Sequence, residues 1–155
     1  AFEAAAAGGK IGQVLQATFT GTQIVNSSPT WVDVTSLSQA ITPVATSSKI
    51  LVIYNINVGG NSDSGTRIIR TSTAIGIGDA ASNRGRPSVD GVNRNAYECQ
   101  MHAFSWLDSP STTSATTYKI QGVGSSCTIN RSVNDSDDFS YFRSASTLTL
   151  MEVLA

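Results

Sequence analysis

The chain has 155 residues, of which 40% are hydrophobic and 14% charged, and its net charge is −1. This length predicts a single domain with a sizeable core, since a protein of this size buries roughly 68–70% of the surface its unfolded chain exposes. The charge argues against nucleic acid as a partner, because phosphate binding needs clustered Lys and Arg. The longest apolar run, residues 50–54, is far below the roughly 20 residues of a membrane span, so no membrane insertion is expected.

The first nine residues, AFEAAAAGG, are small and end in glycine, so we expect a linker there and a domain at residues 10–155. Beyond the linker, apolar residues recur with period two in short runs separated by Gly, Ser, Asn and Pro. This pattern predicts an all-β protein with the antiparallel β-sandwich architecture. The expected strands are residues 11–19, 30–34, 38–42, 49–58, 66–71, 74–77, 96–107, 116–123, 127–131 and 146–154.

Two expected strands are apolar on both faces. In the strand at 49–58, alternate residues from Ile50 share one face while Leu51 and Ile53 lie on the other, and the last strand repeats the pattern. Either a loop or a neighbouring copy must cover the second face, because each side chain left exposed forfeits roughly 1.5–3 kcal/mol. We favour assembly. The candidate interface residues are Leu51, Ile53, Tyr54, Leu148, Leu150, Met151 and Val153.

If successive strands reverse direction, the later loops fall at opposite ends of the sandwich. Residues 59–65 and 79–95 share one end and are rich in Asp, Asn and Arg, and binding groups often lie on loops held by a rigid scaffold. The arginines either contact the carboxylates and phosphates of bacterial surface polysaccharides or pair with acidic residues at a subunit interface. The candidate receptor-binding residues are Asn61, Asp63, Arg84, Arg86, Asp90, Asn93 and Arg94.

Little in the sequence indicates catalysis or metal binding. The one histidine, His102, is three residues from Cys99, and residues three apart in a strand point to opposite faces, so we expect no zinc site. Cys99 and Cys127 are expected to be free thiols rather than a disulfide. No GxSxG motif occurs, and we expect no cofactor and no enzymatic activity.

Two acidic segments, NSDSG at 61–65 and NDSDD at 134–138, have the oxygen-rich composition of calcium loops, although plain turns explain them as well. A glycosidase pair is conceivable among Asp135, Asp137, Asp138 and Glu152. The neighbouring Phe139, Tyr141 and Phe142 could stack on sugars, but we favour packing under a long loop.

Several segments carry a resemblance to a known type of domain. They are GKIGQVLQATFTGT, SSKILVIYNINV, TAIGIGDAASNRGR, FSWLDSPSTTSATTYKIQ and STLTLMEV, and in this order they resemble the C-terminal domain of tail-fibre and other virion structural proteins of marine and cyanobacterial phages. The resemblance implies a jelly-roll-like sandwich, homotrimeric in the manner of tumour-necrosis-factor-like heads. Such a domain is displayed on the virion among other virion proteins and contacts a host-surface glycan or protein. A purely architectural decoration protein is the alternative, and a surface-polysaccharide depolymerase is less favoured.

Overall fold

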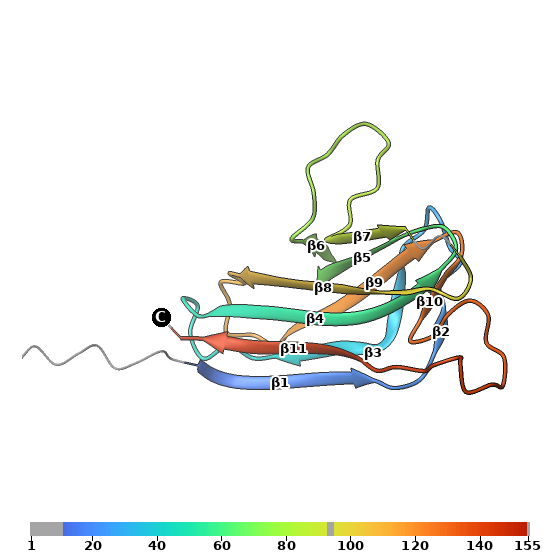
Figure 1. Ribbon diagram of the computed structural model, residues 1–155. Coiled ribbons are helices and arrows are strands. Elements are labelled where there is room, and N and C mark those ends of the chain that lie inside the picture. Colours follow the sequence, from blue (N-terminus) through green and yellow to red (C-terminus); the bar gives the residue numbers. More distant parts are fainter. Residues whose placement is uncertain (1–10, 93–94, 155) are drawn as a thin grey trace, which may run out of the picture.

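The computed structural model describes residues 11–92 and 95–154, so the expected linker lies outside the described residues. The protein is all-β, and its two antiparallel sheets pack face to face as a β-sandwich (Figure 1). No helix in the described part of the chain is long and apolar enough to cross a membrane. The strands are β1 (Ile11–Phe19), β2 (Gln23–Ile24), β3 (Val32–Ile41), β4 (Lys49–Gly60), β5 (Asp63–Arg70), β6 (Thr73–Ile75), β7 (Val89–Val92), β8 (Cys99–Asp108), β9 (Thr116–Gly124), β10 (Cys127–Ile129) and β11 (Ser146–Val153).

The first sheet has six strands in the order β1-β11-β4-β10-β2, and β8 also pairs with β4. The second sheet has five strands in the order β3-β9-β5-β6, and β7 also pairs with β5. The expected strands at 30–34 and 38–42 form one strand, β3, whose register shifts between Asp33 and Ser38. The expectation missed β2 and β7, which are too short to show a period.

The core lies between the two sheets and is built from alternate residues of each strand. Ile50, Val52 and Tyr54 of β4 and Leu148 and Leu150 of β11 are all 0% exposed, so none of their side chains reaches the surface. Three of the seven interface candidates, Tyr54, Leu148 and Leu150, are therefore core residues of the single chain. The other four, Leu51, Ile53, Met151 and Val153, lie on the outer face of the first sheet and are half-buried.

Polar groups inside the core connect the two sheets. Thr66 of β5 shares hydrogen bonds with the Tyr54 hydroxyl at 3.0 Å and with His102 Nδ1 at 3.1 Å, and both partners belong to the first sheet. Near the other end of β8, Asp108 accepts hydrogen bonds from Arg70 Nη1 at 2.9 Å and from the Tyr118 hydroxyl at 2.7 Å. These contacts satisfy buried polar groups and fix β5 and β9 against the first sheet.

Both cysteines are free thiols, as expected. Cys99 pairs with Gly59 from β8, and Cys127 pairs with Gly60 from β10, on the opposite edge of β4. Two strand spacings separate the cysteines, about 9–10 Å, which is too far for a disulfide. Cys99 is exposed whereas His102 is buried, so the two point to opposite faces of β8 as the strand period predicts.

His102 should make folding stability sensitive to mild acid. Its side chain is 1% exposed, and Nε2 has no hydrogen-bond partner among the described residues. Burial lowers the pKa of His102 from 6.5 to about 4, against the opposing effect of Asp90. Between these values the unfolded chain binds a proton that the folded chain does not, so stability is complete above pH 6.5 and falls as the pH drops towards 4.

We expect this group to account for a loss of roughly 2 kcal/mol in the free energy of unfolding between pH 7.5 and pH 5. His102→Asn keeps a polar group near Thr66 but does not titrate, so its stability should decline less over the same range. Urea unfolding of both proteins at the two pH values measures the difference. Equal declines would contradict this role for His102.

Candidate functional site

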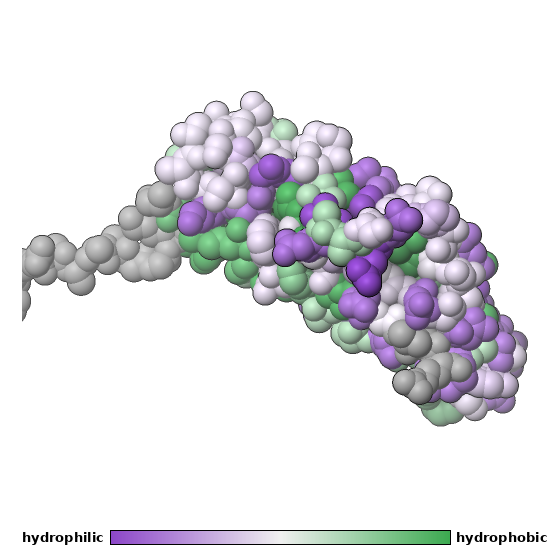
Figure 2. Space-filling model, turned by 90° about the horizontal axis from the view of Figure 1, so that it is seen from above, coloured by the Kyte–Doolittle hydropathy of each residue, from purple (hydrophilic) through white to green (hydrophobic). Residues whose placement is uncertain are grey.

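A cleft of about 780 Å³ lies on the outer face of the second sheet. Its volume falls in the range typical of small-ligand sites, roughly 300–1,000 Å³. One wall is the segment before β3, and the other is the long loop of residues 76–88 that joins β6 to β7 and projects at the top of Figure 1. Figure 2 shows the molecule from above Figure 1, the side on which this loop projects. In this view, strongly hydrophilic residues gather in the middle, with hydrophobic residues exposed among them.

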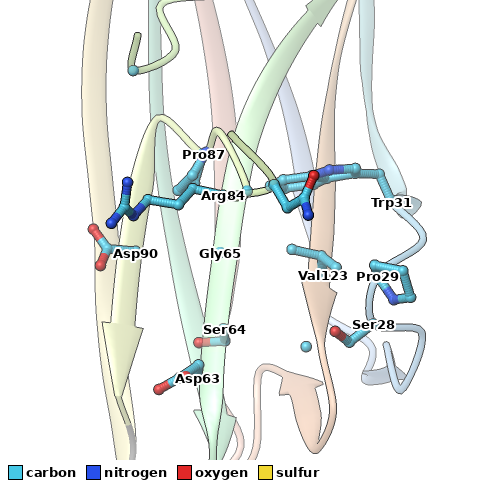
Figure 3. A pocket seen from close by; sticks show the side chains of 14 residues that line it. Ser28, Pro29, Trp31, Asp63, Ser64, Gly65, Arg84, Pro87, Asp90 and Val123 are labelled. Atoms are coloured by element: carbon cyan, nitrogen blue, oxygen red, sulfur yellow. The ribbon is translucent and has the colours of Figure 1, made fainter. Parts of the chain in front are cut away.

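The floor of the cleft depends on a glycine. Gly65 of β5 and Val123 of β9 are cross-strand neighbours there. A Cβ at Gly65 would lie 3.1 Å from Pro87 Cβ and 3.4 Å from Trp31 Cη2. The absence of a side chain therefore lets Trp31 and Pro87 approach the sheet from opposite walls (Figure 3).

Trp31 forms an aromatic platform at the cleft. The guanidinium carbon of Arg67 lies 4.1 Å from the centroid of the Trp31 ring, a cation–π contact. Arg67 Nη2 and Nε donate hydrogen bonds to Gln121 Oε1 at 2.8 and 3.0 Å. Gln121 in turn donates to Asp33 Oδ1 at 2.8 Å, so three neighbouring strands contribute to one row of contacts behind the ring.

Lys119 completes this row, with Nζ 2.7 Å from Asp33 Oδ2. Partial burial of Asp33 opposes its ionisation, but the hydrogen bonds from Lys119 and Gln121 outweigh burial and hold the pKa of Asp33 below its ordinary value. The carboxylate therefore stays charged at neutral pH. We conclude that Asp33, Lys119, Gln121 and Arg67 fix the orientation of Trp31.

Backbone contacts hold both walls in place. On one side, the amides of Ser27 and Ser28 donate to the Gly124 carbonyl at 2.9 and 3.2 Å. On the other, the amide of Gly78 donates to the carbonyl of Pro87 at 3.3 Å, and Arg86 Nε donates to the carbonyl of Gly78 at 2.6 Å. These bonds close the base of the long loop.

The candidate receptor-binding residues divide into three groups. Asp63, Arg84 and Asp90 line the cleft, and Figure 3 shows Arg84 and Asp90 on the same side of it. Arg86 braces the loop, and Asn61 is exposed in the β4–β5 turn without lining the cleft. Asn93 and Arg94 lie outside the described residues.

The expected arrangement of the loops is partly wrong. Residues 79–95 do not form one loop at the end of the sandwich, because β7 occupies Val89–Val92. Since β6 and β7 pair with successive parts of β5, the loop between them leaves the sheet partway along its edge. Asp63 and Gly65, expected in a loop, belong to β5.

Sequence reasoning missed the apolar lining of the cleft, which comes from Pro29, Trp31, Pro87 and Val123. A tryptophan directly after a Ser- and Pro-containing segment was the one available signal, since a half-buried Trp commonly contributes to binding surfaces. No local sequence pattern connects Trp31 to Gly65 or Val123.

Of the acidic residues considered for glycosidase chemistry, Asp135, Asp137 and Asp138 line a second pocket of about 410 Å³, and Glu152 does not line it. Asp135 pairs with Arg143 at 2.7 Å, whereas Glu152 is buried on β11 and accepts a hydrogen bond from the Val44 amide at 2.7 Å. The expected packing of the nearby aromatics is wrong for Phe139 and Phe142, which are 93% and 71% exposed, whereas Tyr141 is half-buried and contacts the ring of Tyr97. Within the described residues, no group of three or more His, Cys, Asp or Glu side chains is placed to hold a metal ion.

Comparison with known proteins adds no assignment. The chain matches no protein-family model and no curated protein sequence. The case for a function therefore depends on the cleft, the exposed surfaces and the chemistry of their side chains.

Gly65→Val tests the construction of the cleft. A branched side chain at this position cannot fit between Trp31 and Pro87, so we expect Trp31 to move outward and the free energy of unfolding to fall by about 1–3 kcal/mol. In a Trp106→Phe background, the fluorescence of Trp31 should shift to longer wavelength. Gly85→Val is the control, because a Cβ there meets no atom within 4 Å. An unchanged spectrum for Gly65→Val would contradict this account.

Proposed function

We propose that this chain is a host-recognition module of a phage particle, part of a tail or head fibre or spike, and that its cleft binds a host-surface receptor. The observation that carries the proposal is the cleft, which combines an oriented Trp31 with two carboxylates and a guanidinium. An apolar platform with a few convergent polar groups is the usual composition of a ligand site. The resemblance to virion domains supplies the setting on the particle surface.

A binding role without catalysis is supported by the chemistry of the candidate groups. His102 is buried in the core and bonded to Thr66, which places it away from any bound ligand. Among the acidic residues considered for hydrolysis, Asp135 pairs with Arg143, Asp138 accepts hydrogen bonds from Ser140, and Glu152 is buried. These contacts favour a binding role over hydrolysis by these residues.

We further propose that copies of the chain assemble through the outer face of the first sheet, as a jelly-roll-like homotrimer. Cross-strand pairing places four apolar side chains in one row over four strands; this apolar row consists of Val14, Met151, Leu51 and Leu107. Val14 is 53% and Leu107 47% exposed. Further along the sheet the face is uncharged, with the rows Gln16–Thr149–Ile53–Ser105 and Thr18–Thr147–Asn55–Ala103. On the other side of the apolar row, the same face carries Lys49, which pairs with Val153. An apolar row next to two uncharged rows favours self-association over binding of a charged partner.

A purely architectural decoration protein is the second candidate, and the apolar row favours it too, since particle assembly alone would explain such a surface. The two proposals differ in whether the cleft binds a ligand. A decoration protein needs no ligand there, whereas a recognition module does.

Adsorption to cells distinguishes the two. We expect the labelled wild-type protein to bind some strains in a broad panel of marine bacteria and cyanobacteria. Trp31→Ala should lower cell binding at least about tenfold, the effect of losing roughly 1.4 kcal/mol. Trp106→Phe is the matched control, because Trp106 is a partly exposed tryptophan on β8, outside the cleft. Absence of binding to every strain would contradict host recognition and favour the decoration protein.

Sedimentation tests the assembly. At micromolar concentration we expect a species of three times the 16.2 kDa chain mass. The double variant Val14→Lys/Leu107→Lys should sediment as a monomer, because it places charges in the apolar row. Ser38→Lys/Ala40→Lys is the control, because both residues are exposed on β3 of the second sheet, outside the cleft, and it should assemble as the wild type does. A monomeric wild type would overturn the proposed interface.

A further inference from the structure

We propose that the ligand of the cleft is an uncharged saccharide, one ring of which stacks on the exposed face of Trp31. The inference rests on the proposed function, since it names the chemical class of the receptor. It differs from one of the two alternatives that the sequence left open for the arginines, contact with an anionic polysaccharide.

The orientation of Trp31 leaves one face of its ring open to a ligand. Asp63, Gly65 and Arg67 all point outward from β5, and the Trp31 ring reaches over Gly65, between the other two. Arg67 covers the ring, so the face turned towards Asp63 is left for a ligand. Figure 3 shows the ring edge-on above Val123, with Pro29 beside the same space and Asp63 and Ser64 at its far end. A flat apolar surface bordered by polar groups suits the C–H face and the hydroxyls of a sugar ring.

The charges that line the cleft favour an uncharged ligand. Among the described residues that line the cleft, two carboxylates, Asp63 and Asp90, stand against the single guanidinium of Arg84. Arg84 lies on the side of Asp90, and Arg86 is engaged with the Gly78 carbonyl (Figure 3). A carboxylate on the ligand would meet this negative surplus, whereas hydroxyl groups donate strong hydrogen bonds to carboxylates.

The pairing of the strands at the floor of the cleft excludes an extended peptide added as a further strand. At the floor of the cleft, β5 is paired with both β9 and β7. On its other edge β9 pairs with β3 as far as Gly122, and beyond it the carbonyl of Gly124 accepts the amides of Ser27 and Ser28. Neither floor strand therefore has a free edge for main-chain hydrogen bonds. The cleft offers a ligand only side chains and the backbone groups of loops.

The experiment compares neutral with acidic sugars. Calorimetric titration would use oligosaccharides of neutral hexoses and N-acetylhexosamines, and length-matched oligosaccharides that contain uronic or sialic acid. We expect a neutral oligosaccharide to bind and the acidic ones to bind at least about tenfold more weakly. Trp31→Ala should weaken neutral binding by about tenfold or more, and Trp31→Phe should restore part of it. Asp63→Asn should lower the affinity, while Trp106→Phe leaves it unchanged.

Each outcome decides between the proposals. Tighter binding of acidic sugars would overturn the inference, as would neutral binding that neither Trp31→Ala nor Trp31→Phe alters. If cells bind in a Trp31-dependent manner but no neutral oligosaccharide binds or competes, the inference fails and host recognition stands. If neutral oligosaccharides bind at Trp31 while no cells are bound, host recognition fails and the saccharide site stands.

Discussion

The alternation of side chains along β4 is the constraint on which the rest of the structure depends. Ile50, Val52 and Tyr54 face the second sheet and are completely buried, while Leu51 and Ile53 face outward. A slip of one residue would exchange these two sets and remove the Tyr54 hydroxyl from Thr66. Because β8 pairs along one edge of β4, and β11 and β10 along the other, its register fixes three further strands.

The same constraint reaches the cleft through β5. A short turn connects β4 to β5, and Thr66 and Ile68 then point into the core. Thr66 is held by both Tyr54 and His102, so its outward neighbours Gly65 and Arg67 have fixed positions on the other face. The ring of Trp31 is therefore oriented by contacts in the core as well as by its own row of hydrogen bonds.

The two outer faces of the sandwich have different chemistry. The outer face of the first sheet carries the apolar row, and the two rows that contain Ile53 and Asn55 carry no charge. The outer face of the second sheet carries the cleft and the ion pair of Asp33 with Lys119. Assembly through the first face leaves the second open to a ligand, since they lie on opposite sides of the molecule. This division suits a module that must be held on a particle and also reach a receptor.

The sequence by itself determined the all-β class and most strand positions, because a period of two is a local property that each segment carries alone. It also singled out Asp63, Arg84 and Asp90, which line the cleft. It could not separate the core face of β4 or β11 from the outer face, since both are apolar and only the packing of the second sheet distinguishes them. Nor could it find Trp31, whose role depends on Gly65 and Val123. These residues are far apart in the chain, and only the pairing of β3, β9 and β5 brings them together.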